Sequence, residues 1–354
     1  MDFLQGIMLT PSHNGGIRDA KELLSTTHHT ADQRASTTSI QLLLCAAAHR
    51  RHVYSARIFH LDLIKSPSNG RDRVSYTTLM VHLEIGRANL PLLKLAGELA
   101  DRFDANLIGI VACQPMQVIY ADGYMPVDVT EQSRRELEKE NQRAEAEFRD
   151  AFRQHARSVS WRSTVMNGSL SDYIAAQARS ADLIITGLAT GDFFDASRSA
   201  NTGELIMQAG RPVLVVPAAV AAQKMERMLI CWRDTRESRR AVVDALPLLK
   251  KASHVTVVEI TDSKNLSDAK KRLDDVVSWL KTHGVLATAI APPPAPATAA
   301  AIDDGSALYA VANEHGIDLI IAGAYGHSRL REWAFGGVTK DLLMSTNRCS
   351  LLSH

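Results

Sequence analysis

Cysteine is scarce in this sequence, and its spacing matches no metal or redox pattern. The four cysteines are far apart, and they form no C-x-x-C pair and have no histidine at zinc-like spacing: Cys45, Cys113, Cys231 and Cys349. Single cysteines within apolar runs are typical of buried side chains in a reducing compartment. We therefore predict neither a redox pair nor a structural zinc site, and no other metal ligands.

Long hydrophobic runs and an excess of charge of one sign are also lacking. No stretch of about 18 apolar residues occurs, and the short apolar stretch 42–48 is followed, not preceded, by basic residues. We therefore expect no membrane partner and no secretory signal, and we expect a cytoplasmic protein. The 40 Lys and Arg nearly cancel the 39 Asp and Glu. Affinity for a phosphate backbone needs many unopposed cations, so we expect no nucleic-acid partner.

The sequence lacks the common catalytic motifs. It contains no G-x-S-x-G, no H-E-x-x-H, no G-x-x-x-x-G-K-[ST] and no S-G-G-x-D-S. We therefore name no catalytic residues and favour a binding module over an enzyme. At most, we expect slow hydrolysis of a bound ligand without a dedicated base.

The first 75 residues differ in composition from the rest of the chain. They contain six of the 13 histidines, runs of Ser and Thr, and no sustained helical or strand period. We predict a disordered or loosely ordered extension over 1–75. The globular pattern begins abruptly at 74–76.

From residue 77 onward, apolar strands alternate with helices, which is typical of a parallel sheet covered on both faces. The predicted strands are 79–83, 107–111, 161–165, 182–187, 212–217, 228–232, 255–260, 285–290, 318–323 and 349–352. The predicted helices are 89–103, 129–157, 171–179, 238–249, 266–283, 305–314 and 334–345.

The order of elements repeats, and so do the letters. Residues 181–187 (ADLIITG) match 317–323 (IDLIIAG). Upstream, Gly168-Ser169 with Tyr173 matches Gly305-Ser306 with Tyr309. A single repeat of this length indicates a duplicated domain rather than a solenoid. We predict domains at 76–217, the first half, and 226–354, the second half, joined at about 218–226.

The second half contains a glycine segment that could hold a phosphate. Gly323-Ala-Tyr-Gly326 directly follows a strand, and after nine residues Gly336-Gly-Val-Thr339 opens a helix. Glycines allow close backbone approach, and free N–H groups at a helix start attract anions. The loop 232–235 should lie opposite, because ligands of open parallel sheets bind at the switch point. On spacing alone, glycines that only serve tight turns explain the pattern equally well.

The duplication, the order of elements and the pattern G-x-x-G-x9-G-G-V-T resemble a tandem universal stress protein over about 76–354. The resemblance implies two adenine-nucleotide alpha-hydrolase-like α/β domains. Each would be a doubly wound five-stranded parallel sheet, and the two would pair within the chain as a pseudo-dimer. It also implies a stress-response role and ATP or AMP as ligand, with Mg²⁺ as an optional companion of the nucleotide. Carried over by position, the nucleotide-binding residues are Gly323, Gly326, His327, Ser328, Gly336, Gly337, Val338, Thr339 and Arg233.

The sequence departs from that family's pattern at two positions of the second half. Gly337 stands where binding members carry Ser or Thr, and Arg233 stands where they carry Asp, with Asp234 one step later. We interpret Arg233 as favouring phosphate while losing a nucleoside contact.

The first half departs further. Its glycines Gly187 and Gly191 are separated by three residues, Asp192 and Asp195 add negative charge, and Glu204 replaces the hydroxyl residue. We interpret this half as a mainly structural partner. A nucleotide-free scaffold that acts through protein partners or oligomers is the alternative function. A homodimer of the whole chain is left open.

Overall fold

The computed structural model describes residues 75–115, 127–155, 157–188, 198–220, 224–292, 304–325 and 348–354. All of them belong to the unit Asn69–His354. The predicted extension 1–75 and the predicted helix 334–345 lie outside the described residues, apart from residue 75 itself. The predicted domain boundaries therefore stay predictions.

The described strands form one ten-stranded sheet in the order β3-β2-β1-β4-β5-β10-β9-β6-β7-β8. The first half supplies β1 (Thr78–His82), β2 (Asn106–Cys113), β3 (Val159–Val165), β4 (Leu183–Gly187) and β5 (Val213–Val216). The second half supplies β6 (Arg227–Cys231), β7 (His254–Val258), β8 (Ala287–Ile290), β9 (Leu319–Gly323) and β10 (Cys349–Ser353). Within each half all pairs are parallel, which confirms the predicted doubly wound fold class.

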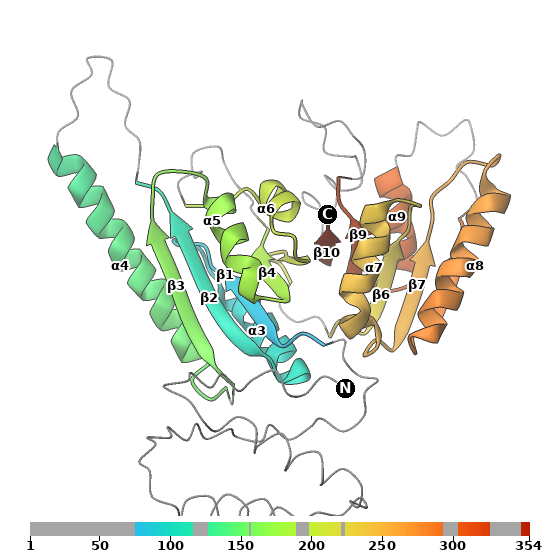
Figure 1. Ribbon diagram of the computed structural model, residues 1–354, viewed down its shortest axis with the longest axis horizontal. Coiled ribbons are helices and arrows are strands. Elements are labelled where there is room, and N and C mark those ends of the chain that lie inside the picture. The colour runs from blue at the N-terminus through green and yellow to red at the C-terminus, as the bar shows by residue number, and fades with distance from the viewer. Residues whose placement is uncertain are drawn as a thin grey trace, which may run out of the picture. The chain divides into compact units, whose positions relative to one another are not determined.

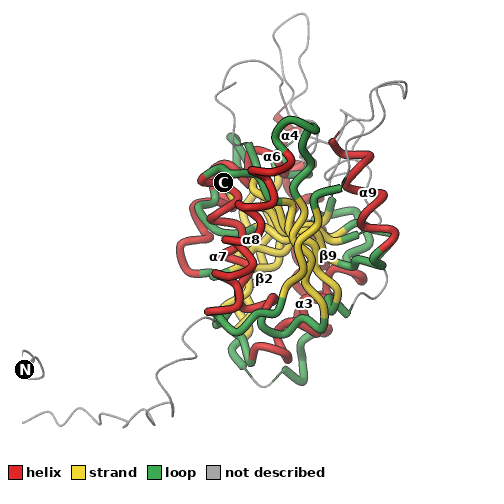
Figure 2. The backbone as a smooth tube through the Cα atoms, turned by 90° about the vertical axis from the view of Figure 1, so that its right-hand side faces the viewer, coloured by secondary structure: helices red, strands yellow, loops and turns green. Residues whose placement is uncertain are grey.

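Helices cover both faces of the sheet, as Figure 2 shows. Their bounds are α3 (Leu90–Phe103), α4 (Val127–Ala151), α5 (Leu170–Gln177), α6 (Thr202–Gln208), α7 (Arg236–Leu249), α8 (Leu266–Thr282) and α9 (Asp304–Glu314), with a 3₁₀ turn at Ala178–Ser180. One core lies under α3, α4, α7 and α8, and the other lies under α5, α6 and α9. In Figure 1, α4 and α8 lie at opposite ends of the sheet.

The two halves meet where β5 pairs with β10. This pair is antiparallel, with Leu351 opposite Leu214. The registers of β4–β5 and β9–β10 make Leu214 and Leu351 equivalent positions of the two halves. The pseudo-twofold axis therefore passes through this leucine pair. The predicted pseudo-dimer is confirmed, and its two sheets are continuous, which the sequence did not predict.

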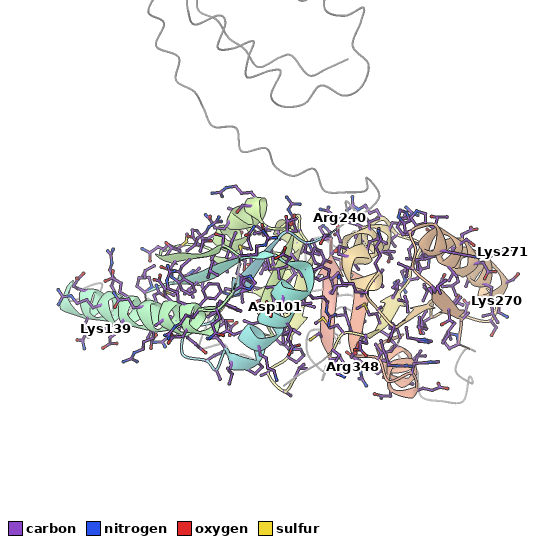
Figure 3. All side chains as sticks on the ribbon, turned by 90° about the horizontal axis from the view of Figure 1, so that it is seen from below. Asp101, Lys139, Arg240, Lys270, Lys271 and Arg348 are labelled. Atoms are coloured by element: carbon purple, nitrogen blue, oxygen red, sulfur yellow. The ribbon has the colours of Figure 1, made fainter. Side chains whose placement is uncertain are left out.

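Helix α7 of the second half also contacts the first half. The Tyr76 hydroxyl donates to the Asp244 carbonyl oxygen at 2.6 Å, and Arg240 Nη2 donates to the Gly210 carbonyl oxygen at 2.8 Å. Burial, together with Asp244 and Asp182, raises the pKa of Tyr76, so its hydroxyl remains a donor. Figure 3 shows Arg240 on the opposite side of the sheet from Arg348, which directly precedes β10. The seam is thus fixed by side chains as well as by the β5–β10 ladder.

One residue of the repeat, Asp182 in the first half and Asp318 in the second, makes the same backbone hydrogen bonds in both halves. Asp182 accepts from the backbone N–H groups of Thr77 and Thr78, at 2.8 and 3.0 Å. Asp318 accepts in the same way from Glu226 and Arg227, at 3.0 Å each. The aspartate of the repeated Asp-Leu-Ile-Ile therefore ties the start of the central strand to its neighbour in each half.

Several predicted bounds differ from the structure by one or two residues, and the predicted end of one helix was wrong by more. The helix predicted over 129–157 ends at Ala151. Phe152 turns into the core with 6% exposure, and His155 Nε2 lies 2.9 Å from the Ala105 carbonyl oxygen. These contacts end the helix by drawing the chain back to the sheet. Among the helices that the structure describes, none is both long and apolar enough to cross a membrane.

Candidate functional site

The carboxyl ends of β6 and β9 define the candidate site. The two strands are neighbours, with Cys231 opposite Ala322. In the sheet β6 lies between β7 and β9, so the connection after β6 leads to the strand on one side of it, and the later strand β9 is added on its other side. This is the topological switch point at which open parallel sheets bind ligands. Arg233 follows β6 and Gly323 ends β9, so the structure brings these two predicted site residues to one sheet edge. The other seven, between 326 and 339, lie outside the described residues.

Gly323 lies directly against the start of α7. A Cβ added at Gly323 would lie 2.5 Å from the Glu237 carbonyl carbon and 2.5 Å from the Ser238 nitrogen. Because both atoms belong to the backbone, they cannot move aside as a flexible side chain could. Glycine is therefore required at this position for the packing of the helix on the strand. Its proposed role beside a phosphate is additional to this one.

The first turn of α7 is capped by its own side chains. Thr235 is the N-cap, and its Oγ1 accepts from the Ser238 N–H at 3.3 Å. The Ser238 hydroxyl lies 3.4 Å from the Arg233 nitrogen, which ties the β6–α7 loop back onto the helix. The loop that carries Arg233 thus starts and ends at fixed points, while Arg233 itself is exposed.

Three acids near this edge are each paired with an arginine. Arg239 donates to Asp234 at 2.6 Å, Arg236 pairs with the buried Glu237, and Arg272 Nε lies 3.2 Å from both carboxylate oxygens of Glu259. The arginine neutralises the negative charge of each acid, which lowers the repulsion that an anion would meet here.

The carboxyl group of Glu237 stays ionised despite its burial. Desolvation opposes ionisation, but hydrogen bonds from Arg236, from its own backbone N–H and from Thr235 outweigh it and hold its pKa below the ordinary value. An acid in the first turn also interacts favourably with the helix dipole. Nearby, burial raises the pKa of the Cys231 thiol, so this cysteine is neutral rather than a nucleophile.

The equivalent edge of the first half carries a buried acid. The registers of β1–β4 and β6–β9 place Glu84 at the position of Arg233. Glu84 is 5% exposed. Its Oε1 accepts from the Ser199 hydroxyl at 2.8 Å, and its Oε2 lies 2.9 Å from Arg87 Nε. The carboxylate therefore links the β1–α3 loop to the residues that lead into α6.

Further contacts hold this edge of the first half together. Asn89 Oδ1 accepts from the Glu84 N–H at 3.2 Å, and Asn89 Nδ2 donates to the Glu84 carbonyl oxygen at 3.1 Å. Arg198 pairs with Glu140 of α4 at 3.0 Å. We call Glu84, Arg87, Asn89 and Ser199 the Glu84 cluster. In the first half, the polar groups of this cluster occupy the position at which the second half has Arg233.

Two residues before Glu84 and Arg233, the halves differ again. In the first half His82 Nδ1 lies 2.9 Å from Thr186 Oγ1, and the ring is 1% exposed. Burial lowers the pKa of His82 to about 4, so the imidazole is neutral at pH 7. In the second half the registers place Cys231 and Ala322 here, without this hydrogen bond.

Sequence reasoning missed Glu84 and the residues that hold it. The repeat of 181–187 in 317–323 aligns only β4 with β9, and the equivalence of Glu84 and Arg233 follows from the registers of β1–β4 and β6–β9, which the sequence does not give. The predicted acids Asp192 and Asp195 lie outside the described residues, and Glu204 is exposed in the first turn of α6. Among the described residues, no three His, Cys, Asp or Glu side chains form a group that could hold a metal ion.

Comparison with known proteins shows the fold. No protein-family model matches the sequence, and no curated protein matches it either. The alignment with a solved universal stress protein from Archaeoglobus fulgidus covers 78% of this chain and 97% of the Archaeoglobus chain, with a TM-score of 0.56 and 12% sequence identity. A structure assigned as a universal stress protein from Pseudomonas aeruginosa covers 78% and 93%, with a TM-score of 0.52 and 14% identity. The described chain therefore has the universal stress protein fold.

Proposed function

We propose that the chain is a tandem universal stress protein whose second half binds an adenine nucleotide, ATP or AMP. Its fold is that of universal stress proteins, and its glycine segment resembles the pattern of their nucleotide-binding members, apart from Gly337 in place of Ser or Thr. One observation supports a site in the second half. Arg233 and Gly323 lie at the carboxyl ends of the neighbouring strands β6 and β9, which is the switch point of the sheet, and the acids nearby are neutralised by arginines. The proposed role is that of a nucleotide-binding stress-response module rather than a catalyst.

In this proposal the phosphates lie against the backbone of the glycine segment. The residues proposed to contact the nucleotide are Gly323, Gly326, His327, Ser328, Gly336, Gly337, Val338, Thr339 and Arg233. Arg233 supplies a cation to the phosphates, and the peptide N–H groups that follow Gly323 supply donors. Mg²⁺ would accompany the nucleotide through its phosphates, since among the described residues no metal-ligand group offers it a separate site.

We further propose that each chain binds one nucleotide. At the equivalent edge of the first half, the carboxylate of Glu84 stands at the position of Arg233 and engages Arg87 and Ser199 itself, so the groups of the Glu84 cluster are already used by the protein and not offered to an anion. The first half then serves as the structural partner of the binding half.

Calorimetric titration of the purified protein with ATP and with AMP tests both proposals. We expect one site per chain. Gly326→Asp places a carboxylate in the proposed phosphate site and should abolish binding, whereas Gly191→Asp makes the same change in the first half and should leave binding intact. Equal affinity in the wild type and Gly326→Asp would refute the assigned segment, and two sites per chain would refute the role of the Glu84 cluster.

A nucleotide-free scaffold is the second candidate. The presence of Arg233 where binding members of the family carry Asp favours it, because a contact to the nucleoside is lost. Mass spectrometry of the denatured protein that finds no co-purified nucleotide, together with no shift in melting temperature at millimolar ATP, would establish this alternative over the first.

A further inference from the structure

The side chain of His354 contacts the end of β9. Its Nδ1 lies 3.1 Å from the Ala324 carbonyl oxygen. A carbonyl oxygen can only accept, so Nδ1 carries the hydrogen and donates. The backbone joins the same two segments, because the Ala324 N–H donates to the Ser353 carbonyl oxygen at 2.8 Å. Both polar backbone groups of Ala324 are therefore held by the residues at the end of β10.

The next residue, Tyr325, has a strained backbone. Its φ is 62°, a left-handed conformation that a bulky side chain rarely adopts. Its ring packs on the core under α9, and the His354 ring meets it edge-on with centroids 6.4 Å apart. Such a conformation persists only where its surroundings enforce it. The contacts at Ala324 and on the Tyr325 ring are among those that hold it.

The first half lacks the side-chain part of this arrangement. The registers make Leu188 equivalent to Ala324 and Pro217 equivalent to His354. The backbone bond is kept, since the Leu188 N–H donates to the Val216 carbonyl oxygen at 3.1 Å. Proline has no side-chain donor, so the carbonyl of Leu188 receives no equivalent of the histidine bond. The contact therefore belongs to the half that carries the glycine segment.

We infer that His354 is a positioning residue of the second-half site, which fixes Ala324 and Tyr325 and thereby the direction in which the chain leaves β9. The inference rests on the proposed function for its consequence in binding, but its structural part can be measured without a ligand. His354 acts through its hydrogen bond to the Ala324 carbonyl oxygen, and it is assigned no contact with the nucleotide.

Two substitutions separate the donor from the ring. His354→Phe keeps an aromatic ring beside Tyr325 and removes the donor. His354→Asn removes the ring and can place an amide N–H where Nδ1 lies, so it is the rescue variant. If the hydrogen bond positions Ala324, Asn should behave like the wild type and Phe should not.

Amide hydrogen exchange of the full chain without nucleotide is the first measurement. In His354→Phe we expect about three- to tenfold faster exchange in peptides that cover 319–326, which corresponds to the loss of one hydrogen bond. Peptides from α7 should be unchanged, and His354→Asn should match the wild type. Unchanged exchange in His354→Phe would overturn the inference.

Calorimetric titration with ATP is the second measurement. His354→Phe should bind about three- to tenfold more weakly, and His354→Asn should restore the affinity. Faster exchange with equal ATP affinity in all three proteins would overturn the role in the site. If the wild type binds no ATP, the proposed function fails, and faster exchange in His354→Phe still supports the positioning of Ala324.

Discussion

Substituting Gly323 by alanine should destabilise the protein, whereas the same change at the equivalent Gly187 should not. An alanine Cβ at Gly323 would lie 2.5 Å from two backbone atoms of α7. At Gly187, among the residues that the structure describes, no atom lies within 4 Å of the added Cβ. The two glycines end equivalent strands, so the pair differs chiefly in how close a helix approaches.

The magnitude follows from the overlap. Relief of a 2.5 Å contact requires α7 to move by about 1 Å from β9, and overpacking of this kind costs about 1–3 kcal/mol. Alanine recovers part of this, since it loses about 0.5–1 kcal/mol less backbone freedom than glycine on folding. We therefore expect Gly323→Ala to lower the free energy of unfolding by about 1–2 kcal/mol. Gly187→Ala should leave it unchanged or raise it by up to about 1 kcal/mol.

Urea unfolding followed by circular dichroism measures both variants against the wild type. The midpoint should fall for Gly323→Ala and stay or rise for Gly187→Ala. Equal shifts for the two variants would refute the close approach of α7 to β9. The result also decides how binding data are interpreted, because weaker nucleotide binding in Gly323→Ala could come from a displaced helix.

The remaining predictions concern the first half. The pKa of His82 is lowered to about 4 by burial, below its unfolded value of about 6.5, so its contribution to stability is complete above pH 6.5 and is lost as pH falls toward 4. The loss is at most about 3 kcal/mol, and urea unfolding at pH 7, 5.5 and 4.5 should show a steeper decline in the wild type than in His82→Gln; parallel declines would contradict this. Glu84→Ala leaves Arg87 and Ser199 without their shared acceptor and should cost about 2–4 kcal/mol in urea unfolding, against less than about 0.5 kcal/mol for the exposed Glu204→Ala. Similar costs for these two variants would rule out the Glu84 cluster as a stabilising feature.

The regular elements were predictable because their apolar periods are strong. Strand runs such as 183–185 and 319–322 are wholly apolar, and the repeated Asp182 and Asp318 make the same backbone contacts in both halves. The register of two strands from different halves has no such signal, because a buried apolar strand fits many neighbours. The pairing of Leu214 with Leu351 therefore required the structure.

The candidate site could be predicted only in part from the sequence. Residues that follow adjacent parallel strands meet at one edge, so Arg233 and Gly323 could be placed together from the order of strands. The contact of Gly323 with α7 could not, since it depends on how closely a helix packs. Nor could the contact of His354 with Ala324, which joins the ends of two separate strands.

The position of β10 between β9 and β5 has a consequence for how the chain is made. On the ribosome, β5 is synthesised long before β10 emerges. Until then, the backbone N–H and carbonyl groups of Val213–Val216 that pair with β10 have no hydrogen-bond partner from that strand. An apolar strand edge in that state can recruit the same edge of another growing chain. Chaperones that bind nascent chains should therefore be needed most between the synthesis of the two halves, and premature termination before Cys349 should yield an aggregating product rather than a functional first half.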